Sequence, residues 1–174
     1  MPIGAPSRSG SVCPAIWAFG LTLLSASQET KRMNGDKYFV DSNVFLYIFD
    51  ETNPAKRARA EAWLAWLWEN SCGALSWQVV QEFYWNVLRK FGATAAQGRS
   101  YVRTMSEWSP PDVTLGMIER AWHWSDHAQL CFWDGLIVAA AERTRCRFLL
   151  SEDFQAGREF GLIKVLNPFD TSPG

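Results

Sequence analysis

The stretch KYFVDSNVFLYIF at residues 37–49 decides the fold class that this sequence predicts. Residues 38–40 are an apolar run of the kind that forms a short buried strand, and the run ends at Asp41. Residues 44–49 form a second apolar run, which predicts a short helix. A buried strand that passes almost directly into a helix is typical of a sheet covered by helices.

The chain beyond residue 49 repeats this alternation of strands and helices. Asn53 followed by Pro54 predicts a helix start, and Thr94 with Gln97 predicts a capping box at another. One predicted helix carries an apolar stripe at three- and four-residue steps, made of Ala60, Trp63, Leu64 and Leu67. We expect strands at 74–76, 112–114, 147–150 and 162–166, and helices at 54–70, 77–90, 95–108, 115–127, 132–144 and 155–160. The pattern predicts an α/β fold with helices on both faces of the sheet.

The first 32 residues differ from the rest of the chain. They contain the apolar run 12–24, which is too short to cross a bilayer and is followed by small residues that resemble a leader cleavage site. Met33 directly precedes the first strand, so we expect residues 1–32 to be an upstream extension, with a secretory leader or a disordered arm as alternatives. The domain is then expected at 33–170, with a tail at 171–174.

Composition narrows the function classes. The chain has 174 residues, 48% of them hydrophobic, and a net charge of -1, which suits one globular domain and argues against a uniformly basic nucleic-acid-binding surface. Its 4 cysteines form no C-x-x-C pair, so free thiols in a reducing cytoplasm are expected. The phosphate-binding, dinucleotide-binding and nucleophile-elbow glycine motifs are absent from the sequence.

Four acidic residues lie within or against apolar runs. Asp41 and Asp153 each follow a predicted strand, and the carboxyl ends of parallel strands are where ligands bind in open sheets. Glu82 and Asp134 lie near the starts of predicted helices that can face the same edge. Taken singly, each acid also fits an ordinary role at a helix start, on a helix surface or in a turn. Without these four, 14 acidic residues face 17 basic ones, so the remaining surface is mildly basic.

Four carboxylates in one cleft would repel one another. At about 4 Å each close pair costs on the order of 4 kcal/mol, so the cleft needs either retained protons or a divalent cation. Oxygen ligands favour Mg²⁺ or Mn²⁺, and such ions commonly activate water for attack at phosphorus. The pattern therefore predicts phosphoryl chemistry.

Four segments together resemble the motif string of PIN-domain ribonucleases of the VapC toxin type. They are FVDSNV at 39–44, QVVQEF at 78–83, FWDGLIVAAA at 132–141, and LLSEDF at 149–154 with NPF at 167–169. The resemblance covers the chain from about residue 37 to residue 169. It departs from the usual pattern at Ser42 and Ser151, where threonine is commoner, and at Gly135, where alanine is often found.

The resemblance implies a PIN-like three-layer α/β/α fold with a central, mainly parallel, short-stranded sheet. It implies that Asp41, Glu82, Asp134 and Asp153 bind Mg²⁺ or Mn²⁺ and are catalytic, while Asn43 and Ser151 hydrogen-bond to these acids and orient them. It also implies cleavage of RNA, inhibition by a cognate antitoxin protein, and a homodimer, with no role at a membrane. Glu152 lies beside Asp153, but the motif register favours Asp153. The alternative function is a catalytically silent RNA- or protein-binding module of the same fold.

Other residue patterns have plainer explanations. His123 and His127 have the spacing of a metal-binding pair, but a surface helix end is the expected role because no third ligand is evident. Of the 10 tryptophans, five offer stacking surfaces for RNA bases or an antitoxin helix, with core packing as the default: Trp63, Trp66, Trp68, Trp85 and Trp108. The basic residues in the groups at 56–59 and 143–147 are expected on solvated faces, with contact to a phosphate backbone as the alternative.

Overall fold

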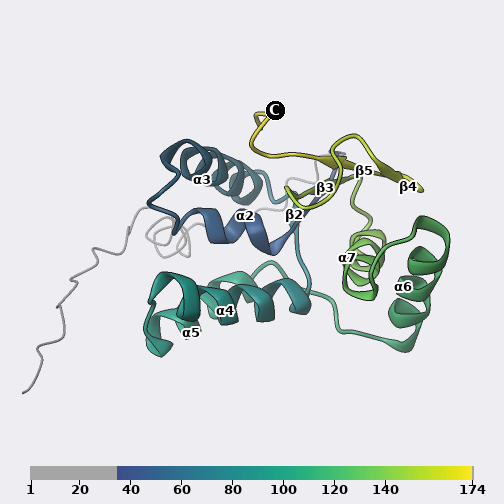
Figure 1. The fold of residues 1–174 in the computed structure, drawn as a ribbon, viewed down its shortest axis with the longest axis horizontal. Helices are drawn as coiled ribbons and strands as arrows, with labels where there is room; N and C mark the ends of the chain where they lie inside the picture. Colours follow the sequence, from purple (N-terminus) through teal and green to yellow (C-terminus); the bar gives the residue numbers. More distant parts are fainter. Residues whose placement is uncertain (1–34, 174) are drawn as a thin grey trace, which may run out of the picture.

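The computed structural model describes residues 35–173 (Figure 1). The expectations for residues 1–32 lie outside this part of the chain. Eleven elements follow in order: β1 (Tyr38–Val40), α2 (Ser42–Tyr47), α3 (Pro54–Glu69), β2 (Gly73–Ala74), α4 (Trp77–Phe91), α5 (Ala95–Ser106), α6 (Leu115–Ala128), α7 (Phe132–Arg143), β3 (Phe148–Leu150), β4 (Glu159–Phe160) and β5 (Ile163–Leu166). The alternation confirms the predicted α/β class.

The five strands form one sheet in the order β2-β1-β3-β5-β4. The pairs β2–β1, β1–β3 and β3–β5 are parallel, and only the edge strand β4 is antiparallel to its neighbour. Val40 pairs with Leu150, so β1 and β3 end side by side. The backbone N–H of Asp41 donates to the carbonyl of Leu150 at 3.0 Å, which extends this pairing to the residue after the strand.

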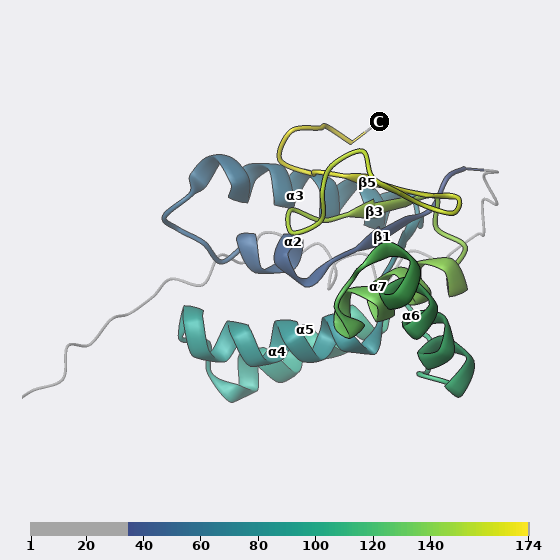
Figure 2. The same ribbon diagram turned by 45° about the vertical axis from the view of Figure 1, so that its right-hand side comes forward.

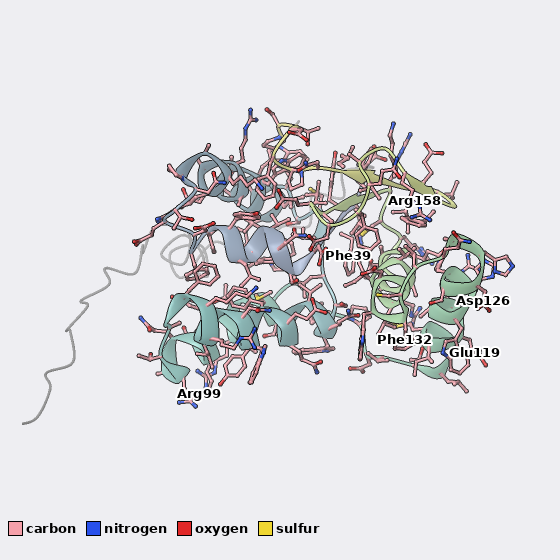
Figure 3. All side chains as sticks on the ribbon, in the orientation of Figure 1. Phe39, Arg99, Glu119, Asp126, Phe132 and Arg158 are labelled. Carbon is pink, nitrogen blue, oxygen red and sulfur yellow. The ribbon has the colours of Figure 1, made fainter. Side chains whose placement is uncertain are left out.

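Helices cover both faces of the sheet, which gives the three-layer α/β/α arrangement. The ring of Tyr38 packs against Trp63 and Trp66 of α3, with ring centroids 5.6 and 5.5 Å away. Phe39 points to the other face, as alternate strand residues do, and lies in the middle of the molecule (Figure 3). Figure 1 shows α3 on one side of α2 and the α4–α5 pair on the other, and Figure 2 shows α6 packed beside α7 near the strands.

Several sequence-based expectations are confirmed in detail. Asn53 caps α3 by accepting a hydrogen bond from the backbone of Lys56, and Pro54 occupies the first position of the helix. The buried residues of α3 are the four of the predicted stripe, Ala60, Trp63, Leu64 and Leu67. Thr94 and Gln97 form the predicted capping box of α5. These local signals worked because each pairs a backbone group with a neighbour in sequence.

Two predicted elements are wrong. Residues 112–114 form no strand, because Thr114 instead caps α6 by accepting from the backbone of Met117. Residues 155–160 form no helix: Gly157 has a φ of 80°, and the chain turns back through Gly161 so that β4 pairs with β5. The two-residue turn between Phe160 and Ile163 is a hairpin connection, and Gly161 supplies the positive φ of 61° that it needs.

The C-terminal residues contact α3. The indole N–H of Trp63 donates to the carbonyls of Pro168 and Thr171, and Arg59 donates to the hydroxyl of Ser172 at 2.6 Å. Thr171 and Ser172 fall in the predicted tail, and these bonds fix their position. Within residues 35–173 no helix combines the length and the apolar character needed to cross a membrane.

Candidate active site

Asp41 lies at the centre of the candidate site. It follows β1 and caps α2, and its side chain accepts a hydrogen bond from the backbone of Ser42 at 2.6 Å. The hydroxyl of Ser151, directly after β3, donates to the other carboxylate oxygen at 2.7 Å. Asp41 is 6% exposed, so a short strand and a helix cap together hold a buried carboxylate at the carboxyl edge of the sheet.

Asn43 joins Asp41 to Asp153. Its side-chain amide nitrogen lies 3.3 Å from Asp41 Oδ2, 3.1 Å from Ser151 Oγ and 3.1 Å from Asp153 Oδ2. The backbone N–H of Asp153 also donates to Ser151 Oγ at 3.1 Å. Adjacent parallel strands place these four residues together, because β1 and β3 end in register.

Glu82 is held near Asp41 by two donors. The hydroxyl of Ser42 donates to Glu82 Oε2 at 2.9 Å, and the amide of Gln78 donates to Glu82 Oε1 at 2.9 Å. Ser76 caps α4, so the helix starts at the sheet edge and presents Glu82 in its second turn. Ser42 therefore links α2 to the acid on α4.

Asp134 has a weaker connection to the cluster. It lies in the first turn of α7, where its backbone N–H meets the Sγ atom of the capping residue Cys131. The amide of Gln78 reaches the carbonyl of Trp133 at 3.3 Å, so one side chain contacts both Glu82 and the residue before Asp134. In residues 35–173 no hydrogen bond joins the Asp134 carboxylate to the other three acids, and no three acid, His or Cys side chains form a compact metal-binding group.

The electrostatics of the cluster leave Asp41 without a compensating positive charge. The pKa of Asp41 is raised to about 6, and burial is the largest cause. Hydrogen bonds from Ser151 and Ser42 act to lower this pKa, while the charges of Asp153 and Glu82 act to raise it. None of the salt bridges in the described part of the chain involves the four predicted acids. Three carboxylates thus share a site without a basic side chain.

Two buried amide oxygens add to this excess of acceptors. Asn43 Oδ1 and Gln78 Oε1 have no hydrogen-bond partner within residues 35–173, although the amide nitrogens of both side chains contact the acids. Carboxylate and amide oxygens are the ligands that hard divalent cations such as Mg²⁺ and Mn²⁺ take. The residues present therefore fit such a cation.

The structure separates Glu152 from Asp153. Glu152 turns away from the cluster and forms a salt bridge with Lys56 and a hydrogen bond with the hydroxyl of Tyr47. Burial raises the pKa of Glu152, but the hydrogen bonds from Lys56 and Tyr47 outweigh it and hold that pKa below its ordinary value. Asp153 faces Asn43 instead, so the motif register and the geometry select the same acid.

Sequence reasoning gave Gln78 and Tyr47 no role in the site, and it expected Lys56 on a solvated face rather than paired with Glu152. Gln78 is four residues before Glu82, and this helical spacing is a signal that would have placed it beside the acid. Lys56 and Tyr47 come from α3 and α2, and no local pattern connects them to Glu152. Their contact depends on tertiary packing alone.

The structure shows the surroundings of the histidine pair and of the tryptophans. His127 contacts the carbonyl of His123 through Nδ1, and no group of metal-binding side chains in residues 35–173 includes the pair. Trp63 is buried, as the default predicts. Trp85 and Trp133, by contrast, are 62% and 61% exposed.

A hollow at the amino ends of β3 and β5, lined by residues that include Arg145 and Lys164, contains none of the four predicted acids.

A search among curated proteins found no match to the chain. A family model described as PIN domain matches residues 38–158, more than half of the chain and all of the segment that carries the predicted acids.

Proposed function

Because this chain belongs to the PIN domain family, we propose that it is an Mg²⁺- or Mn²⁺-dependent endoribonuclease that acts as the toxin of a toxin–antitoxin pair. PIN domains are commonly metal-dependent nucleases. One observation carries the proposal for this chain. A buried carboxylate with a raised pKa, Asp41, lies beside Glu82 and Asp153 with no cationic side chain to balance them.

In this proposal Asp41, Glu82, Asp134 and Asp153 hold the metal. A bound Mg²⁺ or Mn²⁺ would lower the pKa of water and stabilise the negative charge that develops at phosphorus. The chain's other residues orient the acids: Ser151 and Ser42 fix Asp41, Ser42 and Gln78 fix Glu82, and Asn43 fixes Asp153. Such hydrogen bonds keep the carboxylates in place although they repel one another.

The toxin role, the antitoxin partner and the homodimer are supported by the motif resemblance. The cytoplasm as the site of action is supported by Cys72, Cys131 and Cys146, which are free thiols. The second candidate function is that of a catalytically silent binding module. A folded chain that cuts no RNA in the following experiment would favour it.

The test is cleavage of cellular RNA by the purified full chain, with new 5′ ends mapped by sequencing. We expect discrete cuts with Mg²⁺ or Mn²⁺ that vanish in chelator. Asp41→Asn, Glu82→Gln, Asp134→Asn and Asp153→Asn should each lower the cleavage rate by more than about 100-fold, because even residues that only orient a metal ligand commonly cost about 10- to 100-fold.

Glu152→Gln is the matched control. It removes a carboxylate next to Asp153 in sequence, but one that is paired with Lys56 outside the acid cluster. We expect its cleavage rate to stay within about threefold of wild type, since the Glu152 carboxylate bonds to Lys56 and Tyr47 and to none of the predicted metal-binding acids. A folded wild-type chain that binds neither Mg²⁺ nor Mn²⁺ and makes no cuts would overturn the nuclease proposal.

A further inference from the structure

One face of α4 carries a row of functional side chains that continues beyond the acid cluster. Gln78, Glu82, Trp85 and Arg89 are spaced by four, three and four residues, so they line up along one side of the helix. The opposite side carries buried apolar residues, among them Val80, Phe83 and Val87. Along the row, exposure increases from the buried Gln78 to the exposed Arg89. The row therefore leads from the candidate site to the surface.

Trp85 is unusual for its exposure. It is 62% exposed and lies outside the hydrophobic core, although large aromatic residues are mostly buried on average. Its ring lies 5.8 Å from the guanidinium of Arg89, which holds a cation over the indole. Trp85 takes no part in the hydrophobic core of residues 35–173, and its place one turn beyond Glu82 is what favours a binding role.

The backbone of a second exposed tryptophan, Trp133, lies at the other end of the row. Trp133 is 61% exposed, and its carbonyl accepts a hydrogen bond from Gln78 at 3.3 Å. Since Gln78 also contacts Glu82, the backbone of Trp133 adjoins one end of the row, and Trp85 lies one turn beyond Glu82. An exposed tryptophan therefore follows the candidate acid Glu82 along α4, and another comes directly before the candidate acid Asp134 in the sequence.

The spacing of this row suits a short nucleic-acid strand. At about 1.5 Å per helical residue, Trp85 lies about 4.5 Å and Arg89 about 10.5 Å beyond Glu82 along the axis. Stacked nucleotides advance by about 3.4 Å each, so the row spans about three of them. An indole offers a stacking surface for a base, and a guanidinium offers a partner for a phosphate. Base faces are accessible to a protein only where the bases are unpaired.

We propose that Trp85, Arg89 and Trp133 bind an unpaired RNA strand and lead it to the acids. The proposal deepens the proposed nuclease function and rests on it for the identity of the ligand. Trp85 and Trp133 stack on bases at the two sides of the acid cluster, and Arg89 pairs with a phosphate. The site recognises single-stranded RNA and excludes duplex RNA of the same sequence.

The test measures binding separately from cleavage. The full chain is titrated against a fluorescently labelled, unstructured RNA oligonucleotide in chelator, where no cleavage occurs, and the dissociation constant is obtained from fluorescence anisotropy. We expect Trp85→Ala and Trp133→Ala each to weaken binding by about 5- to 150-fold, the range for loss of one stacked base. Trp85→Phe should restore most of the affinity. The duplex form of the oligonucleotide should bind at least about tenfold more weakly than the single strand.

Matched controls come from α6 and α7. Trp122 is 52% exposed, and its helical spacing places it on the face of Glu119 and Asp126, which Figure 3 shows at the outer edge of α6. Trp122→Ala should bind RNA within about twofold of wild type. Arg143 lies in the last turn of α7, as Arg89 does in α4. Arg89→Ala should reduce the slope of log affinity against log salt by about 0.7, and Arg143→Ala should not.

The outcomes separate this inference from the nuclease proposal. If Trp85→Ala and Trp133→Ala bind as Trp122→Ala does, the inference is overturned, and a protein partner becomes the better occupant of this face. Equal affinity for single-stranded and duplex RNA would overturn it as well. The wild-type chain could cut no RNA while Trp85→Ala still binds single-stranded RNA more weakly than wild type does. In that case the nuclease proposal is wrong, and the proposed RNA-binding role of Trp85 is supported. Equal denaturation midpoints for all variants establish that each one is folded.

Discussion

At the scale of single residues, the buried carboxylate of Asp41 carries an electrostatic penalty. Its carboxyl has an ordinary pKa of 3.8, and in the folded chain burial raises that pKa to about 6. The folded chain therefore keeps a proton that the unfolded chain releases as the pH rises from about 4 to about 6. The free energy of unfolding falls across this window, and the full penalty persists above it.

Asp41→Asn should stabilise the metal-free protein. The variant carries no charge at this position, so it avoids the penalty, and above about pH 7 we expect its free energy of unfolding to exceed that of wild type by about 1 to 3 kcal/mol. Urea denaturation in chelator measures the difference. Near pH 4 the wild-type carboxyl is protonated, and the two proteins should become nearly equal. A variant that is less stable than wild type at both pH values would contradict the pKa assigned to Asp41.

The sequence singles out four candidate acids because each one lies within or against an apolar run. Asp41 is the clearest case, since a carboxylate directly after a buried strand has a restricted environment. Their roles stay predictions. The partners of these acids are harder to predict: Ser42 and Glu82 are 40 residues apart, and Lys56 and Glu152 are 96 apart. Such contacts depend on how α2, α3 and α4 pack, which local patterns do not encode.

At the scale of elements, the contact between α6 and α7 depends on a glycine. A Cβ atom at Gly135 would lie 2.6 Å from the backbone carbonyl oxygen of Ala121, closer than side chains and backbone can approach. Gly135 is the residue after Asp134, so the contact also sets where this candidate acid lies. Alanine, which often occupies this place in the resembling motif, would force the two helices apart here.

Gly135→Ala should therefore destabilise the fold by about 1 to 3 kcal/mol, the usual cost of overpacking a close contact. Gly116→Ala is the matched control in α6. Its added Cβ meets only the hydroxyl of Thr114, 4.0 Å away, so we expect a gain of about 0.4 to 1 kcal/mol from reduced backbone freedom in the unfolded chain. Chemical denaturation measures both. Equal effects of the two substitutions would show that the α6–α7 approach is not as close as described.

Element prediction succeeded where the signal is local and failed where pairing is remote. The caps at Asn53 and Thr94 and the stripe on α3 involve neighbours within about one helical turn. The segment 155–160 has no such signal, and its last two residues become β4 only because β5 lies beside them. Residues 112–114 have strand-like composition, but Pro110 and Pro111 precede them and Thr114 caps α6, so no neighbouring strand pairs with them.

At the scale of the whole molecule, charge and fold are coupled through the acid cluster. The net charge of -1 hides an uneven distribution, in which at least three acids gather at one edge of the sheet without a basic partner in residues 35–173. These acids hold the ends of β1 and β3 next to α2 and α4. Their repulsion therefore acts on the elements that define the fold, and a bound cation would relieve it.

The last prediction is that Mn²⁺ or Mg²⁺ raises the melting temperature of the full chain. A ligand that binds only the folded state at about 100 times its dissociation constant adds about 2.7 kcal/mol, which for a chain of this size corresponds to about 5 to 10 °C. Differential scanning fluorimetry in chelator and with increasing Mn²⁺ measures the shift. Asp41→Asn should lose most of it because it removes the central ligand, whereas Glu152→Gln should keep it because that carboxylate pairs with Lys56. An identical shift in wild type and Asp41→Asn would place the bound cation elsewhere on the molecule, and no shift at millimolar Mn²⁺ would remove the physical basis for a metal at this edge of the sheet.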